Sequence, residues 1–186
     1  PMGRYAQGEG VLQQAITGMK TALPSGEVAE SEFPGLMIDR AAFDQALARQ
    51  AVDAGAQLGL ENRVLEVRAS PSGCSLRVRD RSSPGDAVQE LVCRAIVGAD
   101  GPSSLVRRSL GLPRPRHKLV GYQVAFDSPG PIATDHVDLF AGRDVAPGFF
   151  AWVVPRGEHE GLLGLASEPG GMHPKERLEA FLASGP

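Results

Sequence analysis

Apolar residues recur at the spacing of an α-helix in three parts of the chain. The clearest is residues 38–54, where Asp39 can cap the first turn and Gly55 follows the last one. A short helix is expected over residues 103–110, and an amphipathic helix over residues 174–183. The pattern therefore predicts one helix of several turns, with one buried stripe, and two shorter helices.

Alternation of apolar and polar residues with a period of two predicts strands elsewhere. Residues 11–28 alternate weakly around Pro24-Ser25-Gly26, which indicates a hairpin of two short strands. An antiparallel meander with one solvent-exposed face follows, and the last third of the chain predicts a second, larger and largely antiparallel sheet. The meander strands are residues 64–68, 75–79 and 90–94, joined by a loop at 82–86, and the later strands are residues 119–126, 136–141, 149–154 and 161–166.

Residues 95–99 break this alternation because they are apolar without interruption. Such a run is typical of a strand buried on both faces of a parallel sheet. Asp100 and Gly101 follow it at once, and Ser103 or Ser104 can cap the next helix. A carboxylate at a strand end can accept hydrogen bonds from ribose hydroxyls, and a helix N-terminus favours phosphate. The arrangement suits a dinucleotide, although a bare Asp-Gly pair is more often a simple turn.

Composition narrows the class of protein. The 186 residues are 42% hydrophobic and 22% charged, which is typical of a soluble globular chain of one domain or parts of two. The formal net charge is −3 and acidic and basic residues are mixed, so no nucleic-acid partner is expected. The longest basic cluster, Arg107-Arg108 with residues 114–118, is either an anion site or a solvated face.

Metal and membrane sites are not indicated. The four histidines show no metal-ligand spacing with each other or with Cys74 and Cys93, so no metal is expected. No apolar run reaches the roughly 18 residues that a membrane-spanning helix needs, and no signal peptide is recognisable. We therefore expect a cytoplasmic protein with reduced thiols.

The segment around Asp100 carries a resemblance to a known family. Gly98-Ala99-Asp100-Gly101, then Ser104, then Val106-Arg107, then Leu110-Gly111 resembles the second flavin-contacting motif of the superfamily of aromatic hydroxylases and geranylgeranyl reductases. This resemblance implies that Asp100 and Gly101 lie near the ribose and pyrophosphate of FAD. It also implies that Arg107 supports the turn.

A second motif, Asp39-Arg40-x-x-Phe43-Asp44-x-x-Leu47, is similar to a helix start in the same superfamily. The resemblance implies that Arg40 reaches toward the flavin phosphates. Arg40 can instead pair with Asp44 one helical turn later on the surface, which contributes only about 0.3–0.5 kcal/mol. The occurrence of this motif together with the Asp100 motif favours the flavin role.

A third motif bears on the substrate. Two segments resemble a motif of geranylgeranyl reductases. The first, residues 150–155 with Phe150, Trp152 and Pro155, resembles its aromatic-x-Trp-x-Phe-Pro part, and the second, residues 164–166, which begin at Gly164, resembles its Gly-x-Gly part. The resemblance implies a substrate surface, and the candidate substrate-binding residues are Phe149, Phe150, Trp152, Pro155 and Gly164. Val154 and Ala166 depart from the motif, which leaves the substrate open, and a tryptophan on a strand is also commonly a core residue. No residue is an evident catalytic acid or base.

The predicted fold class is α/β (α+β), with part of a three-layer FAD/NAD(P)-binding domain over residues 1–118 and part of a largely antiparallel substrate-binding domain over residues 119–186. The superfamily's Gly-x-Gly-x-x-Gly segment does not occur in the sequence. We therefore expect an internal fragment of a longer enzyme, which alone binds FAD weakly or not at all and is inactive. A truncated sheet can expose edges and apolar surface that the whole protein covers. The fragment can therefore self-associate.

The resemblance implies that reduced FAD in the whole protein reduces isoprenoid double bonds of a geranylgeranyl-type substrate, with NAD(P)H as electron donor. An FAD-dependent aromatic monooxygenase is the first alternative, and a non-catalytic binding or assembly module is the second. The expected substrate is a small hydrophobic molecule, prenyl or aromatic, and peripheral contact of the whole protein with a membrane stays open.

Overall fold

The computed structural model describes residues 10–83 and 85–184, so Pro84 of the predicted 82–86 loop lies outside the described residues. The described chain forms two compact units. One unit contains the residues up to Ala54 and from His117 onward, and the other contains Gly55–Arg116. Both units combine strands with short helices, which confirms the predicted mixed α/β class.

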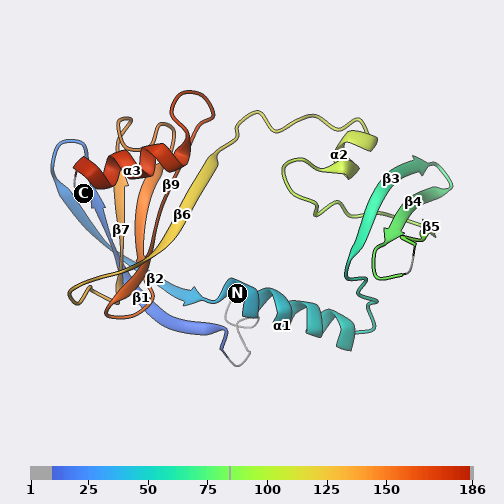
Figure 1. The fold of residues 1–186 in the computed structure, drawn as a ribbon, viewed down its shortest axis with the longest axis horizontal. Coiled ribbons are helices and arrows are strands. Elements are labelled where there is room, and N and C mark those ends of the chain that lie inside the picture. Colours follow the sequence, from blue (N-terminus) through green and yellow to red (C-terminus); the bar gives the residue numbers. More distant parts are fainter. Residues whose placement is uncertain (1–9, 84, 185–186) are drawn as a thin grey trace. The chain divides into compact units, whose positions relative to one another are not determined.

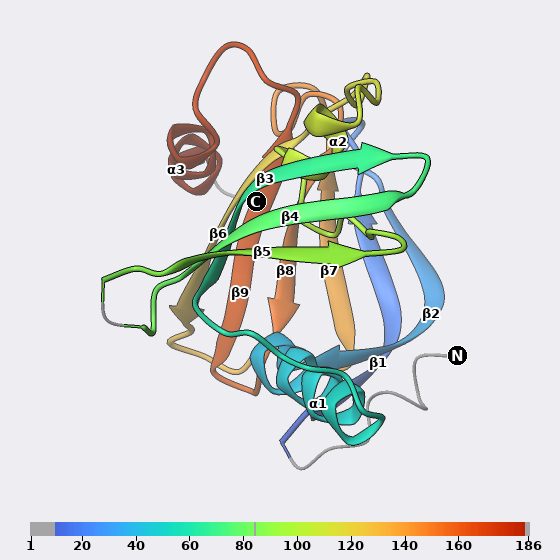
Figure 2. The ribbon, with the colours of Figure 1, turned by 90° about the vertical axis from the view of Figure 1, so that its right-hand side faces the viewer.

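A six-stranded sheet organises the first unit, in the order β2-β1-β7-β8-β9-β6 (Figures 1 and 2). All neighbouring pairs are antiparallel except β1 and β7, which are parallel. The four later strands are confirmed within about two residues of the prediction. The strands are β1 (Leu12–Ala22), β2 (Val28–Ile38), β6 (Val120–Asp127), β7 (His136–Ala141), β8 (Phe150–Pro155) and β9 (Glu160–Ser167).

The N-terminal hairpin is longer than the sequence pattern predicted. The turn lies at Pro24-Ser25-Gly26, where it was expected, and Gly26 has a φ of +83°. The second strand does not end at Val28 but begins there and continues to Ile38, because backbone pairing with β1 extends over its whole length. The hairpin joins the same sheet as β6–β9, while the division of the whole protein at residue 118 stays a prediction.

The core of this unit lies between the sheet and helix α3 (Pro174–Ser184), which contacts β6 and β9 (Figure 1). Alternate residues of β8 and β9 point to α3, so Ala151, Leu163 and Leu165 are buried together with Leu178 and Phe181. The Phe140 and Phe181 rings meet edge to face with centroids 5.1 Å apart. The helix predicted at 174–183 is thereby confirmed.

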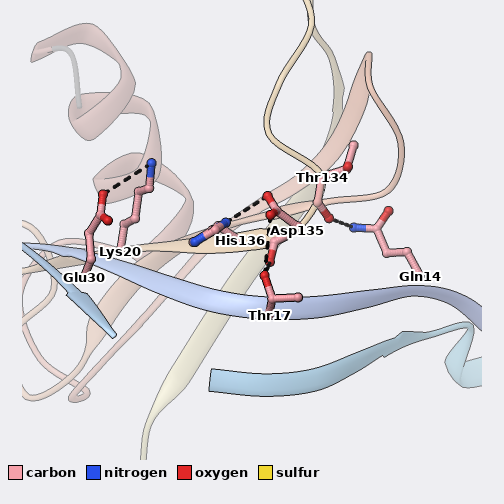
Figure 3. Close-up of polar contacts among 7 residues, drawn as sticks. All are labelled: Gln14, Thr17, Lys20, Glu30, Thr134, Asp135 and His136. Carbon is pink, nitrogen blue, oxygen red and sulfur yellow. Dashed lines mark hydrogen bonds and ion pairs between the residues drawn. The ribbon is translucent and has the colours of Figure 1, made fainter. Parts of the chain in front are cut away.

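Side-chain and backbone bonds hold β1 against the segment before β7 (Figure 3). The backbone N–H groups of Thr17 and Gly18 both donate to the carbonyl of Asp135. His136 Nδ1 lies 2.8 Å from Oδ1 of Asp135, and this contact is the main cause that keeps the pKa of the Asp135 carboxyl below its ordinary value. A Cβ at Gly18 would collide with the His136 ring, so any side chain at this position would displace that ring. This arrangement joins parts of the chain that are far apart in sequence.

Helix α1 (Arg40–Asp53) follows β2 and begins at the predicted cap. The Asp39 carboxylate accepts a hydrogen bond of 2.8 Å from the backbone N–H of Ala42. The predicted stripe is seen in part: Ala46 is buried, Ala42, Phe43 and Leu47 are half-buried, and Gln50 and Ala51 are exposed. The apolar spacing of α1 thus makes a helix whose surface is largely exposed in this structure.

The second unit contains an antiparallel meander of β3 (Asn62–Ser70), β4 (Gly73–Asp80) and β5 (Val88–Cys93). Figure 2 shows the three strands side by side, with the short helix α2 (Leu105–Ser109) against β3. One face carries the ion pairs of Glu66 with Arg68 and Arg77, and the other carries Val67 and Val78. The predicted meander with one solvent-exposed face is confirmed.

The strand predicted at residues 95–99 is wrong. This segment has no regular secondary structure, and Val97 is 88% exposed. A strand needs a neighbour to share its backbone hydrogen bonds, and none of the described strands pairs with this segment. An apolar run alone therefore did not fix the local structure.

Candidate functional site

The turn after residues 95–99 is organised by the Asp100 carboxylate. Its Oδ2 accepts hydrogen bonds from the backbone N–H groups of Leu105 at 2.6 Å and Val106 at 3.3 Å. A hydrogen bond from the Ser104 side chain, together with these two N–H groups, keeps the pKa of Asp100 below its ordinary value. Asp100 is therefore ionised at neutral pH and caps the start of α2.

Gly101 and Arg107 complete this turn. Gly101 has a φ of +76°, a left-handed conformation that favours glycine, and its carbonyl accepts the N–H of Ser104. The Arg107 N–H donates to the Ser104 hydroxyl at 2.9 Å, and its guanidinium donates to the carbonyl of Leu112 at 3.4 Å. The Arg107 side chain thus bonds to the segment that follows α2, and its role in supporting the Asp100 turn stays a prediction.

The first N–H groups of α2 are already engaged by the protein. Leu105 and Val106 donate to Asp100, and Arg107 donates to Ser104. The predicted role of this helix start as a phosphate-binding end is therefore not seen in the structure, because capping side chains satisfy those donors.

A cavity of about 640 Å³ lies beside Asp100 within the second unit. Its volume falls within the roughly 300–1,000 Å³ typical of small-molecule sites. The wall combines the ionised Asp100 carboxylate and two guanidinium side chains with apolar residues of the 95–99 segment. The residues that line it are Glu61, Asn62, Arg63, Val64, Leu76, Arg81, Ile96, Val97, Gly98, Ala99, Asp100, Leu105 and Val106.

Sequence reasoning missed Arg63 and Arg81 as members of this site. Both are placed by the meander, because Arg63 is at the start of β3 and Arg81 directly follows β4. The register pairs Asn62 with Asp80, which brings these two arginines to the same end of the sheet. A guanidinium can hold phosphate or carboxylate oxygens by paired hydrogen bonds. In the sequence these are only two charged residues at the ends of strands. Such residues are too common to indicate a binding site.

Loss of the Asp100 carboxylate is expected to release the start of α2. In Asp100→Ala, amide hydrogen exchange at Leu105 and Val106 should speed up about five- to tenfold, the effect of losing a helix cap. Asp80→Ala is the matched control, because Asp80 also accepts hydrogen bonds, from Ser82 and Ser83, but should leave those two amides unchanged. Equal exchange at Leu105 and Val106 in both variants would contradict the capping role.

The same capping contribution has a defined pH dependence. The pKa of Asp100 in the folded protein lies below that of an ordinary aspartate. The Asp100 cap therefore contributes its full share of stability at any pH above the ordinary aspartate pKa. It is lost as the pH falls through the lowered value. Exchange at Leu105, corrected for the intrinsic effect of pH, should therefore show no loss of protection until the medium is more acidic than an ordinary Asp pKa.

Arg40, the third predicted FAD contact, belongs to the first unit, whereas Asp100 and Arg107 belong to the second. Its guanidinium donates to both carboxylate oxygens of Asp44 at 3.3 Å, and its side chain is 75% exposed. The structure thus shows the surface pairing that the sequence allowed. A role of Arg40 toward a flavin stays a prediction.

The predicted substrate residues lie around strands β8 and β9. Phe149 and Phe150 stack with centroids 4.0 Å apart, and the Phe150 ring meets Trp152 edge to face at 6.1 Å. Trp152 is paired with Gly164 across the strands, and its indole covers this glycine so closely that a Cβ there would lie 2.6 Å from Cζ2. Phe149, Phe150 and Trp152 form an aromatic cluster on the sheet face opposite α3, and Gly164 is buried beneath the indole.

Gln123 belongs to this surface, whereas Pro155 does not. Gln123 on β6 accepts a hydrogen bond of 2.8 Å from the Trp152 indole N–H, and sequence reasoning missed it. Its only signal is its register with Gly164, which depends on pairing between distant strands. Pro155 is fully buried, so its side chain offers no surface to a ligand in this structure.

Other kinds of site receive no support from the described residues. They contain no group of three or more His, Cys, Asp or Glu side chains that could hold a metal ion. Within the same residues, no helix combines the length and apolar character needed to cross a bilayer.

The fold is shared with solved structures. A geranylgeranyl bacteriochlorophyll reductase-like protein from Thermoplasma acidophilum matches this chain with a TM-score of 0.77 at 22% identity, covering 95% of this chain and 47% of that protein. This likeness shows a shared mixed α/β fold. Residues 27–165 match the family described as FAD binding domain. The chain belongs to the FAD binding domain family, which confirms the resemblance inferred from its motifs.

Two relatives in sequence are digeranylgeranylglycerophospholipid reductases from archaea. The protein from Methanothrix thermoacetophila is 31% identical, with 92% of this chain and 46% of the relative covered. Digeranylgeranylglycerophospholipid reductase 1 of Methanopyrus kandleri is 32% identical, with 80% of this chain and 41% of the relative covered. The chain thus spans less than half the length of these relatives.

Proposed function

We propose that the whole protein is an FAD-dependent reductase that saturates isoprenoid double bonds of a geranylgeranyl-type lipid. The observation that carries the proposal is the 31% identity over 92% of this chain to a relative named digeranylgeranylglycerophospholipid reductase. The aromatic cluster at Phe150 and Trp152 supports it, because exposed aromatic side chains can contact a prenyl chain.

The residues of the second unit fit a nucleotide cofactor. The ionised Asp100 carboxylate borders the cavity and can accept hydrogen bonds from hydroxyl groups, and Arg63 and Arg81 can attract phosphate oxygens. In the proposal, Asp100 and Gly101 bind FAD at this cavity, Arg107 keeps their turn in shape, and Arg40 contacts the cofactor's phosphates. Bound FAD would supply the redox chemistry, and NAD(P)H is the proposed electron donor.

The first unit contributes the substrate surface in this proposal. Phe149, Phe150 and Trp152 present aromatic rings, and Gly164 allows the indole to lie flat against β9. The bond from Trp152 to Gln123 fixes the indole, so the apolar surface is held in one orientation. Pro155 acts through the packing below this surface and does not touch the substrate.

The activity test uses the full-length protein with its FAD reduced under anaerobic conditions. The reduced protein is then mixed with a geranylgeranyl phospholipid. A gain of two hydrogen atoms for each reduced double bond, detected by mass spectrometry, is the expected result. A product that gains an oxygen atom, formed from an aromatic substrate with oxygen uptake, would instead support the monooxygenase alternative. A folded full-length protein that binds no FAD would support the non-catalytic alternative.

Trp152→Ala is expected to lower kcat/KM for the lipid about tenfold or more, mainly through KM, since contact with the prenyl chain is lost. Trp152→Phe is the matched variant, because it keeps an aromatic ring and should retain most of the activity. FAD absorbance and thermal unfolding of each variant show whether the cofactor site and fold are intact. Equal loss in the two variants would argue against a contact with the substrate.

A further inference from the structure

Two cysteines stand directly opposite each other in the meander. Cys74 on β4 and Cys93 at the end of β5 are register partners in an antiparallel pair. Both thiols are free, and both residues are half-buried. They are the only cysteines among the 186 residues.

The register gives the Cα separation that a disulfide needs. Opposite residues of an antiparallel pair have Cα atoms roughly 4.5–5.5 Å apart, and disulfides span Cα separations of roughly 4.4–6.8 Å. Side chains of register partners also point to the same face of the sheet. A bond between Cys74 and Cys93 therefore requires side-chain rotation and no change of strand pairing.

Cys74 is accessible from solvent. Cys74 lines an open hollow of about 350 Å³ at the end of the β3–β4 hairpin, together with Ser72 and Gly73. Gly73 has a φ of +139°, and a Cβ there would lie 2.9 Å from the carbonyl of Cys93. This close approach brings the end of β5 against the hairpin, so the two cysteines are held beside each other.

We propose that Cys74 and Cys93 are an oxidant-sensitive dithiol that forms a reversible cross-strand disulfide. With hydrogen peroxide as oxidant, a thiolate attacks one peroxide oxygen and the O–O bond breaks, which gives a sulfenic acid and a hydroxide that takes up a proton to become water. The second thiolate then attacks the sulfenic sulfur, an S–S bond forms, the S–O bond breaks, and a second water leaves. In total the two thiols lose two electrons and two protons, and the peroxide takes up both to become two water molecules. Exchange with an external dithiol restores both thiols.

The disulfide joins the end of β5 to β4. Cys93 is the last residue of β5, and the chain continues from it through residues 95–99 to Asp100. Oxidation therefore restrains the start of the segment that lines the cavity beside Asp100. This inference stands on the strand register and does not depend on the proposed reductase activity.

The full-length protein is treated with hydrogen peroxide at mildly alkaline pH, where thiolate is available, then blocked with N-ethylmaleimide and digested with trypsin. The expected result is a linked pair of peptides, residues 69–77 and 82–94, which contain Cys74 and Cys93. N-ethylmaleimide labelling of both cysteines should fall in parallel, and dithiothreitol should restore it. Unlinked, fully labelled peptides from peroxide-treated folded protein would overturn the proposal.

The matched control moves one thiol by a single position. Cys93→Ser combined with Val92→Cys keeps two thiols, but the new one points to the opposite face, since side chains alternate along a strand. Val92 is 82% exposed, so the change is compatible with folding. This variant should give no linked peptide, and linkage equal to that of the native pair would show that the register is not responsible. In Cys93→Ser alone, Cys74 should stop at the sulfenic acid, which dimedone traps.

Discussion

Replacement of Leu165 by alanine is expected to lower the free energy of unfolding by about 2–5 kcal/mol. Leu165 is completely buried in the middle of β9, within the cluster formed with Leu178 and Phe181 of α3. Alanine removes apolar contact and leaves a cavity that the surrounding sheet cannot fully close. Urea unfolding followed by circular dichroism gives the midpoint and slope from which this loss is obtained.

Leu162→Ala is the matched control for this prediction. Leu162 lies on the same strand but on the opposite face, and it is only half-buried. Its truncation should cost clearly less than that of Leu165, because less apolar surface returns to water. Similar losses for the two variants would mean that α3 does not cover β9 as the structure shows.

The second large effect is expected for Gly164→Ala, which should destabilise the protein by about 1–3 kcal/mol through overpacking. The added Cβ would lie 2.6 Å from the Trp152 indole, so the ring must move and its hydrogen bond to Gln123 is lost. Trp152 is the only tryptophan among the 186 residues, so its fluorescence reports the displacement. We expect a shifted emission maximum of this tryptophan.

Gly121→Ala is the control on the neighbouring strand. A Cβ at Gly121 would have its nearest neighbours, the Leu165 carbonyl and the Ala166 Cβ, at 3.5 and 3.7 Å, which is ordinary van der Waals contact. This variant should keep both the emission of Trp152 and the stability of the protein. An unchanged spectrum in Gly164→Ala as well would contradict the close packing of the indole on β9.

Elements governed by local patterns were predictable from the sequence. The Asp39 cap, the turn at residues 24–26 and the strands of the meander depend on neighbours within a few residues, and all lie where they were predicted. The prediction of a strand at residues 95–99 was wrong because it depends on a partner that is not a neighbour in sequence. An apolar run becomes a strand only when another strand pairs with it. The extent of β2 was missed because its polar residues depend on pairing with β1.

The candidate sites follow the same division. The Asp100 turn could be predicted because its carboxylate, glycine and serine are adjacent in sequence and act on one another. Gln123, Arg63 and Arg81 could not, because only strand register brings them to Trp152 or to the cavity. The burial of Pro155 likewise depends on residues that are distant in sequence. One of them is Gln14, whose side chain donates a hydrogen bond to the Pro155 carbonyl.

The parallel pairing of β1 with β7 has a consequence for synthesis of the chain on the ribosome. The bond from Thr17 to Asp135 joins residues 118 positions apart, and the whole second unit is made between them. Nascent β1 and β2 must therefore wait for β7 before their sheet can close, whereas the meander has only local contacts to form. The edge of β1 that pairs with β7 therefore stays without its partner strand while the second unit is made.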